Sequence, residues 1–216
     1  MTNTIFRVSR IYKAFGALQV IDNVSISLSI GRIHCLIGPN GAGKTSLFNL
    51  ITGELQPDFG GIFLNDHDIS KKSSDYRARS GIIRSFQRNN VFLNFTVREN
   101  LSLACFLKCR ASHVFWRQAR SFSDLQIEVE GNAEKFGLSE YLDRPAKTLA
   151  YGIQRQLELS LSIIQDPVIL LLDEPTSGMS PQETDSFVEL ISAFRGTLTV
   201  LSVSYTHLTL PTNREV

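Results

Sequence analysis

The sequence predicts an α/β protein built around a mostly parallel sheet, with an antiparallel β subdomain near the N-terminus and a helical insertion. Short apolar runs alternate with helix-patterned segments along most of the chain. The run 168–172 is apolar throughout, as central parallel strands are. From about residue 97 to 136 the composition changes to leucine, alanine, glutamine, glutamate and arginine at helical spacing, which predicts the insertion.

The predicted elements can be placed in order from apolar periodicity and turn residues. The period-two run VSISLSI and the short run before it predict an antiparallel entry into the parallel core, and residues 56–61 are turn-like. We expect strands at 5–8, 24–30, 33–37, 62–64, 82–86, 168–172 and 198–203, and helices at 46–51, within 97–136 and at 181–194.

Residues 38–45 read GPNGAGKT and lie between the apolar run 33–37 and a helix-like run. Three glycines let the backbone curl so that successive N–H groups point inward, and the following helix adds its partial positive charge there. Lys44 can reach the β- and γ-phosphates of a nucleotide, and the Thr45 hydroxyl is placed to ligate the accompanying Mg²⁺. The pattern therefore predicts a P-loop NTPase fold; the alternative is a flexible glycine turn with a chance lysine.

Two adjacent carboxylates, Asp173 and Glu174, follow the apolar run 168–172. Asp173 can hold the hydration shell of Mg²⁺ opposite Thr45, and Glu174 can polarise a water for in-line attack on a γ-phosphate. An exposed acidic turn after a core strand is the alternative. The phosphate-loop pattern upstream favours the catalytic interpretation.

Composition excludes several classes of partner. Basic residues number 22 and acidic residues 21, so a net charge of +1 gives no electrostatic case for nucleic acid or an anionic membrane surface. The longest aliphatic run, 168–172, is too short to cross a bilayer, and we expect a soluble, cytosolic chain. The odd cysteine count fits a reducing compartment. Cys105 and Cys109 are spaced to present two thiolates on a helix, but they lack further ligands at suitable spacing, which favours packing.

The order of these motifs resembles that of an ATP-binding-cassette (ABC) ATPase from Ile5 to about Val203. The resemblance is carried by the phosphate loop, by Gln87 after IIRSF, by LAYGIQRQLELS and by ILLLDEPTSGM. Tyr151, the segment GIIRSFQRNNVFLNFTVRENL and the insertion FWRQAR are similar to cassettes that serve importers of branched-chain amino acids and of urea- or amide-type solutes.

The resemblance implies roles for individual residues. Phe15 matches the aromatic residue that stacks on adenine, with Tyr12 as a second candidate, although core packing is the alternative for either ring. Gln87 matches the glutamine that contacts Mg²⁺ and the attacking water and moves with the transport partner. The segment 149–154 matches the signature, whose Gly152 backbone and helix N-terminus grip the γ-phosphate of ATP bound to the opposite subunit.

The predicted site residues fall into four groups. They are the catalytic residues Glu174, Gln87 and Lys44; the nucleotide-binding residues Phe15, Tyr12, Gly38, Pro39, Asn40, Gly41, Ala42, Gly43, Lys44, Thr45 and Ser46; the signature residues Leu149, Ala150, Tyr151, Gly152, Ile153 and Gln154; and the metal ligands Thr45, Gln87 and Asp173.

The sequence departs from the family pattern at several positions. Ala150 stands where the signature usually has serine, and a lost charge-assisted hydrogen bond to phosphate costs about 1.5–3 kcal/mol. Ile153 stands where glutamine or glutamate is common, and Ser180 replaces an aspartate or asparagine at the contact between paired subunits. We expect ATP-driven closure to be weakened and not abolished.

The C-terminal segment SYTHLTLPTNREV is anomalous. The family pattern places a switch histidine at Tyr205, whereas His207 comes two positions later, about 6.5 Å further along an extended chain. The tail is similar to read-through sequence at the ends of fragmentary translations. We therefore expect a truncation joined to foreign sequence from about Ser204; the alternative is a natural short variant that uses His207.

The resulting prediction is an ATP-binding and ATP-hydrolysing subunit that binds ATP and Mg²⁺ and powers import of a small solute. The predicted partners are a second cassette subunit, as a homodimer or heterodimer, membrane permeases and, indirectly, a solute-binding protein, but no nucleic acid. The predicted location is cytoplasmic and peripheral, on the inner face of the plasma membrane. Residues 1–96 and 148–203 are assigned to the ATP-binding core, 97–147 to the helical subdomain and 204–216 to an irregular tail. The alternative is a cassette that binds ATP but is catalytically deficient because it lacks the switch histidine.

Overall fold

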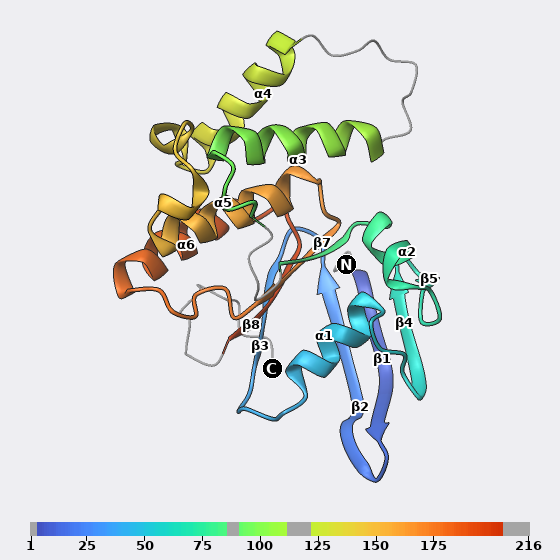
Figure 1. Ribbon diagram of the computed structural model, residues 1–216. Coiled ribbons are helices and arrows are strands. Elements are labelled where there is room, and N and C mark those ends of the chain that lie inside the picture. The colour runs from blue at the N-terminus through green and yellow to red at the C-terminus, as the bar shows by residue number, and fades with distance from the viewer. Residues whose placement is uncertain (1–3, 86–90, 112–121, 205–216) are drawn as a thin grey trace. The chain divides into compact units, whose positions relative to one another are not determined.

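The computed structural model describes residues 4–85, 91–111 and 122–204 of the chain. They form two compact units. The first contains Met1–Arg84, Val168–Pro175 and Ile191–Val216, and the second contains Ser85–Pro167 and Thr176–Leu190. The first unit carries both sheets and the second is mainly helical (Figure 1).

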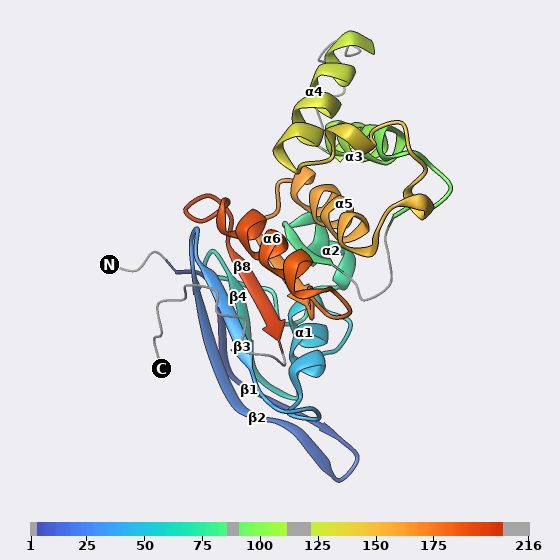
Figure 2. The ribbon, with the colours of Figure 1, turned by 90° about the vertical axis from the view of Figure 1, so that its left-hand side faces the viewer.

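An antiparallel sheet in the first unit has the strand order β2-β1-β4-β5. Its strands are β1 (Thr4–Phe15), β2 (Leu18–Ser29), β4 (Phe59–Leu64) and β5 (His67–Asp68). The two long strands β1 and β2 form a hairpin that both views show (Figure 1 and Figure 2). Gly16 lies in the turn between them with a φ of 59°, a conformation that glycine adopts readily. The predicted antiparallel subdomain is therefore present.

The strand β4 begins earlier than expected, because the segment interpreted as a turn continues into the strand. Phe59 pairs with Tyr12, and the register against β1 shifts between Ser9 and Tyr12. Gly60 has a φ of 88°, and a Cβ there would lie 2.2 Å from the carbonyl oxygen of Arg10. The glycine therefore allows two backbones to approach closely at a β-bulge, where the sequence suggests a turn.

A second sheet has the order β3-β8-β7-β6. Its strands are β3 (Ile33–Ile37), β6 (Ile82–Ser85), β7 (Ile169–Asp173) and β8 (Val200–Ser204). The central strand β8 is parallel to β3 on one side and to β7 on the other. Because carboxyl ends of parallel strands meet at one edge, the segments that follow β3 and β7 leave the sheet at the same edge.

One continuous core holds the first unit together. Helix α1 (Lys44–Thr52) contributes Leu47, Phe48, Leu50 and Ile51, and all four are nearly inaccessible to solvent. They pack in one cluster with apolar side chains from both sheets. The helix that follows the phosphate loop is thereby fixed against both sheets by burial of its apolar face.

The C-terminal end of α1 is closed by a buried arginine. Arg77, on the short helix α2 (Ser74–Arg79), is fully buried and donates to carbonyl oxygens of Leu50, Ile51, Ser70 and Lys72. Burial lowers the pKa of its guanidinium from the ordinary arginine value. Its positive charge lies at the negative end of the α1 dipole, where last-turn carbonyl groups need donors.

The second unit is built from helices. These are α3 (Val97–Ala111), α4 (Phe122–Lys135), α5 (Tyr151–Ile164), most of α6 (Pro181–Ser192), and the 3-10 helices η1 (Ser139–Tyr141) and η2 (Ala146–Thr148). Helix α3 packs against both α4 and α5 (Figure 1). Cys105 on α3 is fully buried, and the side chain of Cys109 lies outside the described residues.

We predict that Arg77→Ala lowers the free energy of unfolding by about 2–4 kcal/mol, because carbonyl groups at the end of α1 lose a buried donor. Urea-induced unfolding followed by circular dichroism measures the change. Arg79→Ala on the same helix is the control, since the Arg79 side chain is 80% exposed and its ion pair with Asp75 lies on the surface. Equal losses in the two variants would contradict a structural role for Arg77.

Candidate nucleotide-binding site

The predicted phosphate loop connects β3 to α1. Gly41 and Gly43 have φ values of 80° and 82°, which side-chain-bearing residues rarely adopt. A Cβ on Gly43 would also lie 2.8 Å from the Val20 carbonyl oxygen. In the described structure, no side chain caps the start of α1 and no acidic residue occupies its first turn. This N-terminus therefore offers backbone N–H groups and the positive end of the helix dipole to an anion.

Lys44 is the first residue of α1 and is 6% exposed. Its Nζ donates to the carbonyl oxygens of Gly38 and Pro39 at 2.6 and 2.7 Å. The ammonium group is thus held within the loop itself. Thr45 is exposed and Ser46 is half-buried, so the Thr45 side chain is accessible to a ligand at this place.

Asp173, at the end of β7, forms a buried ion pair with Arg84 of β6. The Arg84 guanidinium donates to Asp173 Oδ2 at 2.7 Å and to Asn49 Oδ1 of α1 at 2.7 Å. The side chains of Arg84 and Asp173 are 9% and 2% exposed. A guanidinium therefore joins the carboxylate to the helix that follows the phosphate loop.

The other oxygen of this carboxylate suits a cation. Asp173 Oδ1 is buried and has no hydrogen-bond partner among the described residues. Buried carboxylate oxygens rarely lack a partner, and oxygen atoms are the ligands that Mg²⁺ prefers. The donor set at this end of β7 therefore fits a magnesium ion.

Glu174 follows directly, with a φ of 48° and its N–H donating to the Val203 carbonyl at 3.0 Å. A non-glycine residue in this left-handed region is strained and is often found at functional sites. Desolvation and the neighbouring Asp173 charge raise the pKa of Glu174, and the positive charge of Lys44 acts in the opposite direction. A carboxylate with a raised pKa is suited to accept a proton near neutral pH.

The two aromatic candidates for nucleotide stacking differ in exposure. Phe15 ends β1, is 47% exposed, and has the Lys13 ammonium 5.7 Å from its ring centroid. Tyr12 is half-buried and packs edge-on against Phe59, with ring centroids 6.4 Å apart. The exposed ring of Phe15 is thus the better stacking surface of the two.

The signature segment lies in the second unit, at the start of α5. Leu149 is buried, Ala150 occupies the N-cap position without a side-chain cap, and Gln154 Nε2 donates to the Leu149 carbonyl at 3.1 Å. The N–H of the buried Gly152 donates to Glu183 Oε1 of α6 at 2.9 Å. Ile153 is half-buried.

Tyr151, which stands where the family has glycine, ties this helix to the turn before α6. Its hydroxyl donates to the Ser177 carbonyl at 3.1 Å. The same oxygen accepts from Arg155 Nε and Nη2 at 2.9 and 2.7 Å. Arg155 in turn pairs with the buried Glu158 at 2.6 Å. The tyrosine is therefore held by a chain of side-chain contacts along α5.

Sequence reasoning missed two of these polar groups. A charged residue inside the strand-like run 82–86 is a signal for Arg84. The spacing of Ser180 and Glu183 before a helical run is a capping-box signal for Glu183. Gln87, Tyr205 and His207 lie outside the described residues.

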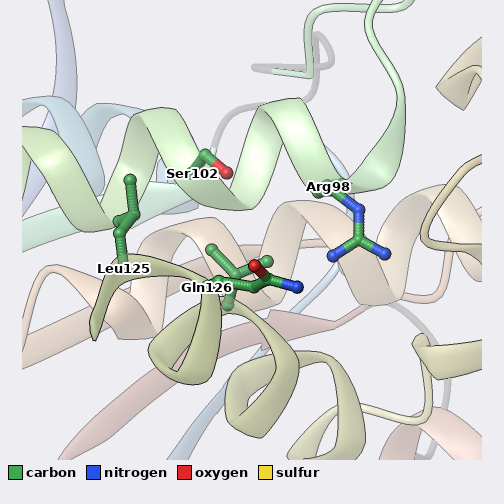
Figure 3. A pocket seen from close by; sticks show the side chains of 5 residues that line it. Arg98, Ser102, Leu125 and Gln126 are labelled. Atoms are coloured by element: carbon green, nitrogen blue, oxygen red, sulfur yellow. The ribbon is translucent and has the colours of Figure 1, made fainter. Parts of the chain in front are cut away.

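A small cavity lies between α3 and α4 (Figure 3). Its volume is about 260 Å³ and it is lined by Arg98, Ser102, Leu125, Gln126 and Val129. The Arg98 guanidinium is paired with Asp143 at 2.9 Å and Glu130 at 3.6 Å. Small-molecule sites usually measure about 300–1,000 Å³, so this cavity is a weaker candidate than the loop and the carboxylates.

In a P-loop NTPase, a glycine-rich loop connects a strand to a helix, and another strand of the same sheet ends in acidic residues. Strands β3 and β7 of this chain meet that description. The sequence profile of a family described as ABC transporter matches residues 21–177. The chain therefore belongs to the ABC transporter family and is one of its ATP-binding cassettes. Cassettes of this family are ATPases that work with membrane permease components.

Curated relatives and solved structures agree with this assignment. The high-affinity branched-chain amino acid transport ATP-binding protein LivG of Escherichia coli K12 is 38% identical over 90% of this chain and 78% of its own length. BraF of Pseudomonas aeruginosa, with the same description, is 35% identical over 95% of this chain and 83% of its own length. A crystal structure of an ABC transporter cassette in its ADP conformation matches with a TM-score of 0.80 and 28% identity, over 94% of this chain and 82% of that one. Within the described ranges, no helix has the length and apolar character needed to span a bilayer.

We predict that Arg84→Met lowers the free energy of unfolding by about 3 kcal/mol or more, because it leaves the Asp173 carboxylate buried without its partner. The double variant Arg84→Met/Asp173→Asn should lose at least about 1 kcal/mol less unfolding free energy than the sum of the losses in the two single variants. Urea unfolding measures all three, with the exposed arginine variant Arg32→Met as control. Strict additivity would show that the two side chains are not energetically coupled.

Proposed function

We propose that this chain is the ATP-hydrolysing subunit of an importer for branched-chain amino acids or a related amide- or urea-type solute. The observation that carries the proposal is the shared sheet edge, where the phosphate loop follows β3 and Asp173 and Glu174 end β7. The LivG and BraF proteins, which are named as branched-chain amino acid transport ATP-binding proteins, support the solute class.

The bound nucleotide is held mainly by the first unit. Backbone N–H groups of Gly38 and of residues 40–46, together with the Lys44 ammonium, neutralise the phosphates, and Phe15 stacks on the adenine. Thr45 and Asp173 would hold Mg²⁺, with Gln87 as a further ligand from outside the described residues. When bound, the ion neutralises charge on the β- and γ-phosphates.

Glu174 orients the attacking water and accepts its proton. The raised pKa and the closeness of the Lys44 charge support this role. Phosphate-loop N–H groups and Lys44 stabilise the charge that develops on the transferred phosphoryl group. The sheet and the α1 helix fix the backbone of the loop, and the Lys44 ammonium exchanges its contacts with the Gly38 and Pro39 carbonyl oxygens for the phosphates.

The remaining contact comes from a second cassette. The segment 149–154 of one copy closes on the γ-phosphate of ATP bound to the other, with Gly152 N–H as donor. Closure moves partner permeases at the inner face of the plasma membrane, and a solute-binding protein delivers the solute to them. In this assignment residues 1–96 and 148–203 form the ATP-binding core and 97–147 the helical subdomain.

We predict that Glu174→Gln retains ATP binding and lowers kcat for hydrolysis at least about 100-fold, because the amide cannot accept the proton. Fluorescent-nucleotide titration and phosphate release measure the two properties. In the unaltered chain, kcat should fall as pH decreases through an acid limb above the ordinary glutamate range, because a raised pKa protonates Glu174 earlier.

Lys44→Ala is the control for both measurements, since it removes the cation within the loop and should lower ATP binding as well as hydrolysis. Equal hydrolysis by the unaltered chain and Lys44→Ala would show that the chain is not an ATPase. Undiminished hydrolysis by Glu174→Gln would exclude Glu174 as the base.

The solute class is tested by reconstituting the chain in proteoliposomes with the permeases and binding protein encoded by neighbouring genes. We expect leucine to stimulate ATP hydrolysis several-fold and urea or acetamide to do so less. Stimulation by neither class, in vesicles that do contain the assembled complex, would refute the proposed solute. Glu174→Gln in the same vesicles supplies the background rate.

A further inference from the structure

The Glu183 carboxylate connects the starts of two helices within the second unit. One oxygen, Oε1, accepts from Gly152 N–H in the first turn of α5 at 2.9 Å. The other, Oε2, accepts from the N–H and the hydroxyl of Ser180, both at 2.9 Å. Ser180 and Glu183 thus form the capping box of α6. The Oε1 oxygen of Glu183 accepts its hydrogen bond from the signature helix α5.

The approach of the carboxylate requires glycine at position 152. A Cβ on Gly152 would lie 2.6 Å from Glu183 Oε1 and 2.8 Å from its Cγ. The hydrogen bonds from Ser180 and Gly152 hold the pKa of Glu183 below its usual range, so the group carries a full negative charge at neutral pH. A negative charge therefore already rests at the positive end of the α5 dipole.

A second link, from Tyr151, does not depend on this carboxylate. Its hydroxyl donates to the Ser177 carbonyl and is held by Arg155. The start of α5 therefore stays attached to the turn before α6 even when Glu183 moves.

We propose that Glu183 is the resting ligand of Gly152 N–H, and that pairing of two copies exchanges this carboxylate for the γ-phosphate of the partner's ATP. The inference rests on the proposed function, which assigns Gly152 to that phosphate. One N–H has a single proton to donate, and a carboxylate and a phosphate at the same helix end repel each other. Glu183 is therefore a positioning residue that opposes premature closure.

The test measures ATP-dependent pairing by analytical ultracentrifugation, in a Glu174→Gln background that keeps ATP intact. Adding Glu183→Gln removes the charge at nearly constant size. We expect the dissociation constant of the dimer to fall about fivefold to tenfold, and the gain to shrink with added salt. A residue with a merely structural role would weaken pairing when altered, whereas the exchange predicts stronger pairing.

Two matched variants separate the possible causes. Asp185→Asn makes the same charge change at an exposed position of α6 and should alter the dissociation constant less than twofold. Ser180→Ala breaks the capping box but keeps the Glu183 charge, and it removes a side chain at the expected contact between paired subunits, so it should weaken pairing and not strengthen it. Stronger pairing in Glu183→Gln alone supports the exchange, while equal gains in Asp185→Asn would assign the effect to net charge and overturn it.

Binding of fluorescent ATP to single copies distinguishes failure of this inference from failure of the proposed function. That binding needs Lys44 and not Gly152. Intact ATP binding with unchanged or weaker pairing in Glu183→Gln overturns the exchange and leaves the nucleotide site standing. Loss of ATP binding in the unaltered chain overturns the proposed function, and the exchange with it.

Discussion

Parallel pairing of β8 with both β3 and β7 is the constraint on which the rest of the candidate site depends. Residues 33–37 pair with 200–204, and 170–173 pair with 200–203, so two strands far apart in sequence end level with each other. The phosphate loop and the acidic pair are thereby brought to one edge by backbone hydrogen bonds, before any side chain is considered. A register slip between β8 and only one of these two neighbours would separate the loop from the acidic pair by about 3.3 Å per residue.

The hydrogen-bond partners at the two ends of α1 show how the same helix contributes to stability and to ligand binding. At its C-terminal end, Arg77 satisfies carbonyl groups from within the protein. At its N-terminal end, no side chain of the described residues caps the backbone donors, and the Lys44 ammonium is bound to carbonyl oxygens of the loop. Arg84 extends this arrangement, since it joins Asn49 of the same helix to the buried Asp173. The C-terminal end of α1 is therefore closed by the buried Arg77, whereas its N-terminal end is open to a ligand.

Much of this architecture could be predicted from sequence because its signals are local. GPNGAGKT between a strand and a helix, and an apolar strand ending in two acids, each span only a few residues, and the fold they predict is confirmed. The bulge at Gly60 could not be predicted, because glycine serves turns and close backbone approaches equally. The contacts Arg84–Asp173 and Gly152–Glu183 join residues far apart in the chain, so no spacing rule reveals them. The roles of the individual site residues stay predictions.

The left-handed backbone at Glu174 also bears on how this chain can evolve. Asparagine and glycine tolerate that conformation at lower energy than glutamate does, so the position carries a folding cost of about 1 kcal/mol or more as long as the carboxylate is retained. Drift toward a more stable chain at this position would therefore also be drift away from glutamate, either to a residue without a carboxylate or to the shorter aspartate. Among cassettes that share this backbone, those that have lost hydrolysis are the ones free to relax it.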